Sequence, residues 1–511
     1  MSAGEDGVYF RMRFFFFFFL VALCLLDSNI STPHGCFVEE RTALMDIGSS
    51  LTRSNGTVPP SWGRGDGDDD CCLWERVKCS NITGRVSHLY FSNLYDSLEV
   101  LNAHGDSFWR FNTTVFSSFP ELQFLDLSSI YPSSLNIDGL VRLKLPKLQH
   151  LNLSYNWLQE SILADLGELV SLEVLDASSN AMSGVVPTAV LKNLTNLKEL
   201  NLSANGFSGS LPGSLLELPH LDPSGSSLAG RTPINSSLEP VSLQVLNLNN
   251  NRMSGALPTE RGPIPITPSS NLSLSLKGLR FSQNNLSGKL SFFLLRNLTK
   301  LEEISLSGNI NLAVDVNIPG WVPPFQLKQL ALSGCGLDKG IIAEPHFLRT
   351  QHHLQELDLS NNNLSGRMPN WLFTKEATLV NLNLGNNSLT GSLSPIWHPQ
   401  TALQSIVIST NRIAGKLPAN FSAIFPSLST LDLSDNNFHG EIPMSLCSIK
   451  HMKDLSLSNN NFSGEMPTCV FTDFPELWTL SASNNQLGGL VFGGMKKLSI
   501  GFAMQPTEQQ I

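Results

Sequence analysis

The chain has 511 residues, and its 33 basic and 43 acidic residues give a formal charge of −10 at pH 7. A charge this negative, without a basic stripe along the chain, argues against nucleic-acid binding, so we expect no nucleic-acid partner. Length alone suggests several domains, but internal repeats allow a single long array instead.

The N-terminal segment has the pattern of a secretory signal peptide. Arg11 and Arg13 precede an apolar run over residues 14–26. This run is too short to span a bilayer, which takes about twenty residues, but it has the length and the basic flank of a leader. We expect residues 1–30 to form the signal peptide, with cleavage between Asp27 and Gly35.

The cysteines that follow the leader form two groups. An early cluster comprises Cys36, Cys71, Cys72 and Cys79. Three more cysteines lie far downstream, at Cys335, Cys447 and Cys469. Because a leader precedes them, the pattern predicts disulfides formed in an oxidising compartment.

The rest of the chain repeats a short pattern in which two apolar residues flank one polar residue. Leu357-Asp358-Leu359 is one clear copy, and we take the first apolar residue of each copy as its anchor. The anchors are Leu89, Leu125, Leu151, Leu175, Leu200, Leu221, Leu246, Leu279, Ile304, Leu330, Leu357, Leu382, Ile406, Leu431, Leu455 and Leu480. Most are 24 to 27 residues apart, while Leu221 starts a short, decayed copy. Both the pattern and its period are typical of leucine-rich repeats.

Each copy predicts one short strand and one coil of a solenoid. In the copy at Leu357, the alternation directs Leu357 and Leu359 to one side of the strand and Asp358 to the other. Leu354 and Leu364 complete the inward set. One repeat cannot bury these leucines alone, so stacked repeats must form a continuous core. We therefore expect an α/β solenoid, a leucine-rich-repeat superhelix with a parallel β-sheet on its concave face.

A polar residue is also expected inside this solenoid. Most repeats carry Asn five residues after the anchor, at Asn156, Asn180, Asn205, Asn251, Asn284, Asn309, Asn362, Asn387, Asn411, Asn436, Asn460 and Asn485. An inward Asn can bond the backbone of its own turn and of the next coil, which satisfies groups that the turn leaves buried. Cys335 holds this position in its repeat, and we interpret it as a small apolar substitute.

The repeat and the segment before it resemble those of a known family. The pattern Leu-X-Leu-Ser-X-Asn-X-Leu-Ser-Gly-X-Ile-Pro resembles the plant-type extracellular leucine-rich repeat. The preceding segment resembles the N-terminal cap of that family in the residues Cys36, Trp62, Cys71, Cys72, Trp74 and Cys79. The resemblance implies the disulfides Cys36–Cys71 and Cys72–Cys79. It also implies a cap over residues 36–84, about sixteen repeats over 85–490, and an irregular tail over 491–511.

A third disulfide is suggested by spacing. Cys447 and Cys469 are 22 residues apart, slightly less than one repeat. They are therefore expected on adjacent coils, near enough to bridge. The alternative is a pair of buried thiols.

Among relatives, the sequence is most similar to plant receptor-like proteins, which have an ectodomain and a membrane helix but no kinase. It departs from them at its C-terminal end, because the repeats fade after Asn485 and no apolar run near twenty residues follows the leader. The interpretation is either a truncated or alternatively spliced receptor or a secreted form. We expect passage through the secretory pathway, to the extracellular side of the plasma membrane if a full-length form carries the helix, and otherwise to the apoplast.

Many Asn-X-Ser/Thr sequons accompany the leader, and we predict that many of them are glycosylated. They are Asn55, Asn81, Asn112, Asn152, Asn193, Asn201, Asn235, Asn271, Asn285, Asn297, Asn363, Asn386, Asn420 and Asn461. Asn152 and Asn201 are the middle residues of predicted strands and therefore face out of the sheet. Glycans there would shield the N-terminal third of the concave face.

No catalytic motif emerges from the chain. The sequence has no kinase signature, no P-loop, no His-Glu-X-X-His and no Cys-X-X-Cys, so we expect no enzyme activity, no cofactor and no metal. The resemblance implies a receptor ectodomain that binds a peptide, protein or glycan and signals through a co-receptor kinase with its own leucine-rich-repeat ectodomain. The alternative is a secreted inhibitor of a microbial wall-degrading enzyme, similar to polygalacturonase inhibitors.

The expected ligand-binding residues lie beside the later anchors, where no sequon occupies the middle of a strand. Aromatic and charged side chains are the usual anchors of an interface. The candidates are Arg280, Glu303, Lys328, Asp358, Asp432 and Trp478.

Overall fold

The computed structural model describes residues 36–53, 56–63, 70–94, 113–130, 145–186, 193–209, 243–256, 275–343, 345–373, 378–393 and 398–488. The expected signal peptide and the expected tail lie outside these residues. The chain divides into two compact units. The first comprises Met1–Leu158 and Asp165–Leu172, and the second comprises Gln159–Ala164 and Glu173–Ile511.

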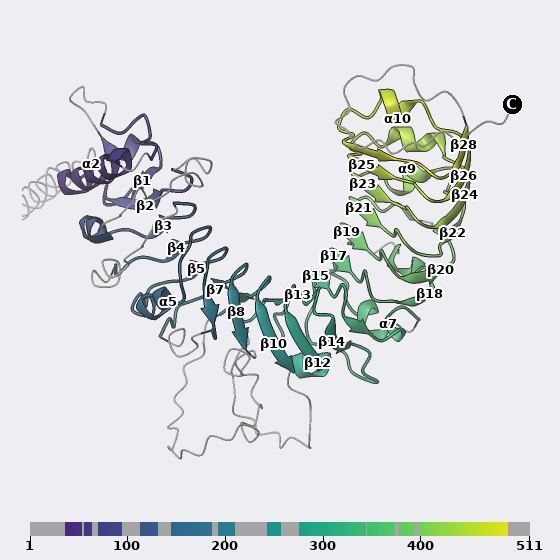
Figure 1. Cartoon of the computed structure of the whole chain (residues 1–511), viewed down its shortest axis with the longest axis horizontal. Helices are drawn as coiled ribbons and strands as arrows, with labels where there is room; N and C mark the ends of the chain where they lie inside the picture. The colour runs from purple at the N-terminus through teal and green to yellow at the C-terminus, as the bar shows by residue number, and fades with distance from the viewer. Residues whose placement is uncertain are drawn as a thin grey trace, which may run out of the picture. The chain divides into compact units, whose positions relative to one another are not determined.

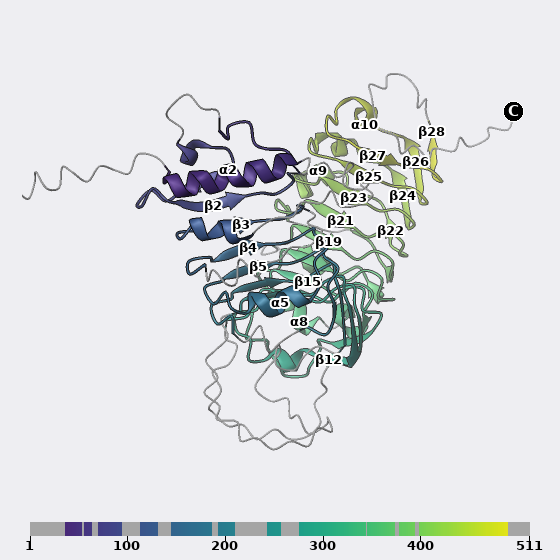
Figure 2. The ribbon, with the colours of Figure 1, turned by 60° about the vertical axis from the view of Figure 1, so that its left-hand side comes forward.

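The first unit joins the cap to the first coils. Its elements are α2 (Val38–Arg53), η1 (Cys71–Leu73), β1 (Val77–Cys79), β2 (Val86–Tyr90), η2 (Thr113–Ser118), β3 (Phe124–Asp126) and β4 (His150–Asn152). Strand β1 pairs antiparallel with β2, and β2, β3 and β4 then pair in parallel. Helix α2 lies along β2 and buries its apolar stripe (Figure 2).

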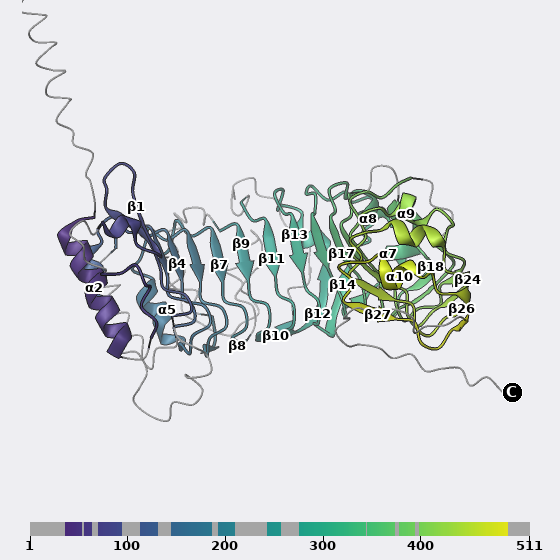
Figure 3. The ribbon, with the colours of Figure 1, turned by 90° about the horizontal axis from the view of Figure 1, so that it is seen from above.

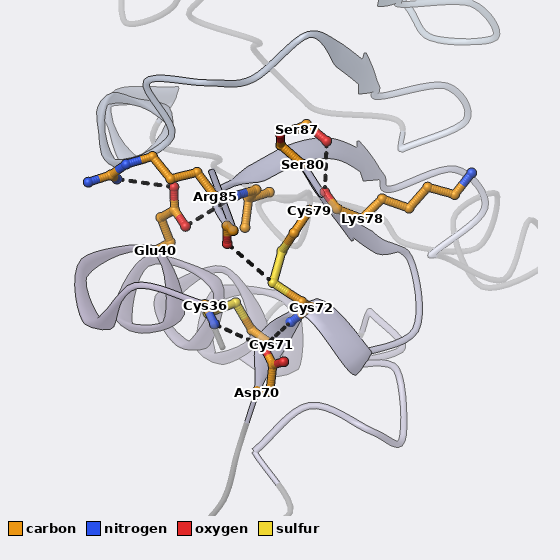
Figure 4. Close-up of a disulfide and its surroundings, with 12 residues drawn as sticks. Cys36, Glu40, Asp70, Cys71, Cys72, Lys78, Cys79, Ser80, Arg85 and Ser87 are labelled. Carbon is orange, nitrogen blue, oxygen red and sulfur yellow. Dashed lines mark hydrogen bonds and ion pairs between the residues drawn. A yellow bond between two sulfur atoms is a disulfide. The ribbon is translucent and has the colours of Figure 1, made fainter. Parts of the chain in front are cut away.

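Two disulfides hold the cap together (Figure 4). Cys36 bonds Cys71 and Cys72 bonds Cys79, the pairs that the family resemblance implies, with Cα–Cα distances of 5.3 and 5.4 Å. Asp70 Oδ1 accepts hydrogen bonds from the backbone N–H groups of Cys36 and Cys72, at 2.9 Å each. One carboxylate therefore ties the two bridges to each other.

A buried carboxylate fastens the cap helix to the sheet. Glu40 on α2 is fully buried, accepts from the backbone N–H of Val86 at 3.2 Å, and pairs with Arg85 at 3.3 Å (Figure 4). Burial raises the pKa of the Glu40 carboxyl, while the Val86 N–H and the Arg85 guanidinium act to lower this pKa. The Arg85 guanidinium also lies 3.7 Å from the Phe37 ring centroid, a cation–π contact.

The second unit is built on a parallel sheet whose strands follow one another in chain order, as β9, β11 and β13 do in Figure 3. These strands, called the main sheet below, are β5 (Val174–Asp176), β7 (Glu199–Asn201), β9 (Val245–Asn247), β11 (Gly278–Arg280), β13 (Glu303–Ser305), β15 (Gln329–Ala331), β17 (Glu356–Asp358), β19 (Asn381–Asn383), β21 (Ser405–Val407), β23 (Thr430–Asp432), β25 (Asp454–Ser456) and β27 (Thr479–Ser481). The predicted solenoid with a parallel sheet is confirmed.

Each main-sheet strand is followed by a strand of a second set, and Figure 1 shows β18 to β28 on the other side of the coils from β17 to β25. They are β6 (Ser183–Gly184), β8 (Gly206–Gly209), β10 (Arg252–Ala256), β12 (Asn285–Ser291), β14 (Asn311–Asp315), β16 (Gly336–Leu337), β18 (Ser365–Arg367), β20 (Ser388–Thr390), β22 (Ala414–Gly415), β24 (Asn437–Glu441), β26 (Asn461–Glu465) and β28 (Gln486–Gly488). Sequence reasoning did not predict these strands.

Short helices connect the coils. They are α5 (Ser161–Leu166), η3 (Phe292–Leu295), α7 (Gly340–Ala343), α8 (His346–Arg349), η4 (Asn370–Phe373), α9 (Phe421–Ile424), η5 (Met444–Ser448) and α10 (Cys469–Thr472). Cys447 on η5 bonds Cys469 on α10, with a Cα–Cα distance of 5.6 Å. This bridge joins adjacent coils, in the position that the spacing predicts.

One predicted repeat is wrong. Strand β7 pairs directly with β9, so that Leu200 is in register with Leu246. No strand therefore lies between these two in the main sheet, and Leu221 itself is outside the described residues, while every other predicted anchor lies in a strand. The copy at Leu221 reads Leu-Asp-Pro, and Pro223 lacks the N–H that a central strand must donate.

The asparagine ladder forms, and Asn436 illustrates it. Its Nδ2 donates to the carbonyls of Leu433 and Ser434 in its own coil, at 3.2 and 3.0 Å. It also donates to the Ile408 carbonyl at 2.9 Å, and its Oδ1 accepts from the Ile413 N–H at 3.0 Å. Ile408 and Ile413 belong to the preceding coil, so the prediction of bonds to the next coil has the wrong direction.

The ladder is interrupted at Cys335. Its buried thiol donates to the Leu306 carbonyl of the preceding coil at 3.3 Å, so it replaces one amide bond rather than serving only as apolar filling. The Leu337 N–H bonds the Cys335 carbonyl at 3.0 Å instead of reaching the next rung. Asn362 Oδ1 is consequently buried without a hydrogen-bond partner among the described residues. Burial raises the pKa of the Cys335 thiol to about 12.

Candidate ligand-binding face

The main sheet presents two side chains per strand to solvent. In β17, Leu357 is 1% exposed, while Glu356 is exposed and Asp358 is half-buried. The same pattern, a buried centre with open flanks, recurs in β23 and β25. We call the surface formed by these flanking side chains the sheet face. Its residues are free to contact a ligand because the strand centres already fill the core.

A residue in the left-handed backbone conformation follows each strand of the parallel sheet. Four residues after every anchor that lies in a strand, the backbone has a positive φ, as at Asn361 (57°) and Asn459 (58°). Asn tolerates this conformation better than most residues, which accounts for its frequency there. Tyr155 occupies the position in the first unit with φ of 55° and a side chain that is 60% exposed. A bulky residue in this conformation is strained, and the core does not require its ring.

Three of the six predicted binding residues are neutralised by neighbours within the second unit. Arg280 Nε donates to Glu303 Oε2 at 3.0 Å, and Arg280 Nη2 contacts the same oxygen. Lys328 Nζ lies 2.8 Å from Glu302 Oε2. Each pair links consecutive coils, so these charges stabilise the array and are less available to a ligand.

The other two acidic candidates keep a free oxygen. Asp358 Oδ1 accepts from the Ser360 N–H at 3.0 Å and hydroxyl at 2.7 Å. Asp432 Oδ1 accepts in the same way from Ser434, at 3.0 and 2.6 Å. Neither Oδ2 has a hydrogen-bond or ion-pair partner in the part of the chain that the structure describes.

These two residues belong to a wider acidic stretch that sequence reasoning did not identify. The flanking residues of β17, β19, β21, β23 and β25 include Glu356, Asp358, Asp432 and Asp454 but no Lys or Arg. Within the described ranges, no cation forms an ion pair with any of the four. We call these five strands the acidic stretch. Trp478, two residues before Leu480 and 71% exposed, lies just beyond it.

The first unit carries an aromatic row on its own sheet face. The Phe124 ring centroid lies 5.7 Å from that of His88 and 5.7 Å from that of His150, and 5.0 Å from that of Tyr90. The binding residues expected from the sequence include none of these four side chains. Burial lowers the pKa of His88, and the charges of Lys78 and His150 lower it further.

The described residues hold no metal-binding cluster of three or more His, Cys, Asp or Glu side chains. Nor does any helix among them have the length and apolarity to cross a membrane.

Family models match both parts of the chain. A leucine rich repeat N-terminal domain covers residues 39–80. Leucine rich repeats are matched at residues 147–169, 196–218, 242–261, 353–374, 427–449 and 451–472. The chain is therefore a leucine-rich-repeat protein that carries the N-terminal cap of this class.

Its relatives are plant receptor-like proteins. Receptor-like protein 9b of Arabidopsis thaliana is 35% identical over 392 residues, which are 73% of this chain and 40% of that protein. Receptor-like protein 15 of the same plant is 32% identical over 450 residues, or 75% of this chain and 42% of that protein. The chain is homologous to these receptor-like proteins and spans about two fifths of their length.

Among solved structures, the plant peptide hormone receptor RGFR1 in complex with RGF2 is 26% identical to this chain. The match has a TM-score of 0.46 and covers 73% of this chain and 53% of that one.

Proposed function

We propose that this chain is the extracellular recognition part of a plant receptor-like protein. In this proposal it binds a peptide or pathogen-derived ligand and signals, in defence or development, through a partner receptor kinase that has its own leucine-rich-repeat ectodomain. Homology to receptor-like proteins supports the receptor role. The disulfide-linked cap supports passage through an oxidising secretory compartment, toward the extracellular side of the plasma membrane or the apoplast.

The acidic stretch is the observation that carries the proposed site. Among the earlier strands of the second unit, Arg280 of β11 pairs its charge with Glu303 of β13. In the acidic stretch, Asp358 and Asp432 keep their Oδ2 atoms open to solvent and have no counter-ion among the described residues. Unpaired charges of one sign attract a ligand of the other sign and orient its approach. We therefore place a basic ligand segment on β17 to β25, with Trp478 as an aromatic contact at the edge.

A peptide-array experiment tests this site. The purified secreted protein is applied to two arrays of random peptides, one enriched in Lys and Arg and one in Asp and Glu. We expect preferential binding to the basic array, weakening as salt is raised. Asp358→Asn combined with Asp432→Asn should reduce that binding about tenfold, or about 1.4 kcal/mol. Trp478→Ala should cost a similar amount or more if the ring is an interface anchor.

Asp176→Asn is the matched control. Asp176 holds the same strand position in β5, but its Oδ2 already accepts from Asn201 Nδ2 at 3.0 Å. This substitution should leave peptide binding unchanged. Equal binding to the two arrays, or an equal loss in the Asp176 variant, would contradict the proposed site.

A further inference from the structure

The aromatic row of the first unit spans three neighbouring strands. His88 on β2, Phe124 on β3 and His150 on β4 stand in register, and Tyr90 lies beside them. All four side chains are half-buried, and their rings contact one another rather than the core. The row is therefore an apolar strip on an otherwise polar sheet face.

A sequon lies inside this strip. Asn152, in Asn152-Leu153-Ser154, is two residues after His150 on β4, so both side chains project from the same face of the strand. Asn152 is in register with Asp126, which places it diagonally next to Phe124 on a strand about 4.8 Å away. Asn152 Oδ1 accepts from the Ser154 N–H at 3.0 Å, and Nδ2 has no partner among the described residues.

We propose that Asn152 is N-glycosylated and that the first sugars of its glycan pack against the aromatic row. In the modification, Nδ2 attacks the anomeric carbon of a polyprenyl-pyrophosphate-linked oligosaccharide. The new C–N bond replaces the C–O bond to the pyrophosphate, which leaves with the bonding electrons, and Nδ2 releases one proton to a base. The attached sugar is then held directly over the neighbouring rings.

The chemistry of the strip fits a sugar ring. A pyranose has a face of C–H bonds and an edge of hydroxyl groups, so it needs an apolar surface beside hydrogen-bonding groups. Phe124 and His150 supply the apolar surface, and Asp126, in register with Asn152, supplies a carboxylate that can accept from a hydroxyl. His88 Nδ1 already pairs with the Ser87 hydroxyl at 2.9 Å, so Nε2 is the ring nitrogen that remains to hydrogen-bond a sugar hydroxyl.

Asn201 provides an internal comparison in the second unit. It is also the last residue of a main-sheet strand, in an Asn-Leu-Ser sequon, with Oδ1 accepting from the Ser203 N–H at 3.2 Å. Its diagonal neighbours on β5 and β9 are Val174 and Val245. A glycan at Asn201 would meet no aromatic row. Asn201 therefore reports the effect of glycan attachment alone, whereas Asn152 reports attachment together with packing on rings.

The test begins with site occupancy. The full chain, expressed through a eukaryotic secretory pathway, is digested and its glycopeptides are analysed by mass spectrometry. We expect Asn152 to be modified, and a peptide with unmodified Asn152 as the main species would overturn the proposal.

Packing on the rings is tested by thermal unfolding of single and double variants. Asn152→Gln and Ser154→Ala both remove the glycan, and Ser154→Ala keeps the Asn152 side chain. We expect each to lower the Tm, and to lower it about 2 °C less when Phe124 is already replaced by Ala. Phe124→Leu, which keeps the apolar volume, serves if the Ala variant does not fold.

The matched cycle uses Asn201→Gln with Val174→Ala, where we expect no such coupling. Equal coupling in the two cycles would overturn the proposal, since ring packing would then contribute nothing. A Tm change in Asn152→Gln that Ser154→Ala fails to reproduce would also overturn it, because the effect would come from the asparagine itself.

Discussion

Replacing one rung of the asparagine ladder tests how much the ladder stabilises the fold. Asn309 is fully buried, and its Oδ1 accepts from the Leu286 N–H of the preceding coil at 3.0 Å. Its Nδ2 donates to the carbonyls of Phe281 at 3.0 Å and Leu306 at 2.7 Å. Asn309→Ala removes all three bonds and changes nothing at the surface.

The magnitude follows from what each partner loses. Phe281 keeps a bond from Asn284 Nδ2, and the Leu306 carbonyl keeps one from the Cys335 thiol. Losing a hydrogen bond to these two carbonyls costs about 0.5–1.5 kcal/mol each, whereas an N–H left unsatisfied in the core, as at Leu286, costs about 1–3 kcal/mol. We expect Asn309→Ala to lower the free energy of unfolding by about 4 kcal/mol.

The neighbouring rung gives the control. Cys335→Ala removes a single weak thiol bond and one sulfur atom, and should cost about 1 kcal/mol. Urea unfolding followed by circular dichroism measures both variants, and hydrogen exchange at the Leu286 amide reports the rung locally. Equal losses in the two variants, or an unchanged exchange rate at Leu286 in Asn309→Ala, would refute the reasoning.

Three further outcomes are expected. Because the folded state raises the pKa of Glu40, its ionisation removes stability as pH rises from about 4.5 through the folded-state pKa. The stability of the wild type relative to Glu40→Gln should therefore be greatest below pH 4.5 and fall toward neutral pH in urea titrations. Replacing Cys447 and Cys469 together by Ser should cost about 3 kcal/mol in urea unfolding under non-reducing conditions, for a bridge spanning 22 residues. Tyr155→Asn should raise the free energy of unfolding by about 0.5 kcal/mol, since Asn tolerates the left-handed backbone; a loss of stability would show that the exposed ring makes a needed contact.

The repeating features of the fold could be predicted because each depends only on position within one coil. Leu357, Leu359 and Asn362 are placed by alternation and by the need to pair buried backbone groups. The copy at Leu221 shows the limit of this reasoning, because the spacing of leucines ignores the missing N–H of Pro223.

The candidate site was less predictable because it depends on contacts between coils. Whether Arg280 is available to a ligand is decided by Glu303, which lies 23 residues away and one strand over. Composition marks both as charged but does not say that they pair. The aromatic row was missed in part for the same reason, since His88 meets Phe124 only after a step between anchors that is much longer than the usual one.

The ladder gives the array a direction. Most rungs reach back, as Asn485 does when its Oδ1 accepts from the Phe462 N–H, so the ladder donor of one coil is paired by the coil that follows it in the chain. Removing the coil of Asn485 would therefore leave an open backbone donor in the coil of Phe462. Removing a coil from the other side would open strand donors, such as the Thr479 N–H that bonds the Lys453 carbonyl, but it would open no donor that a ladder amide serves. During synthesis, each new coil would supply the ladder hydrogen bond that the coil made just before it lacks. The ladder would therefore form in chain order.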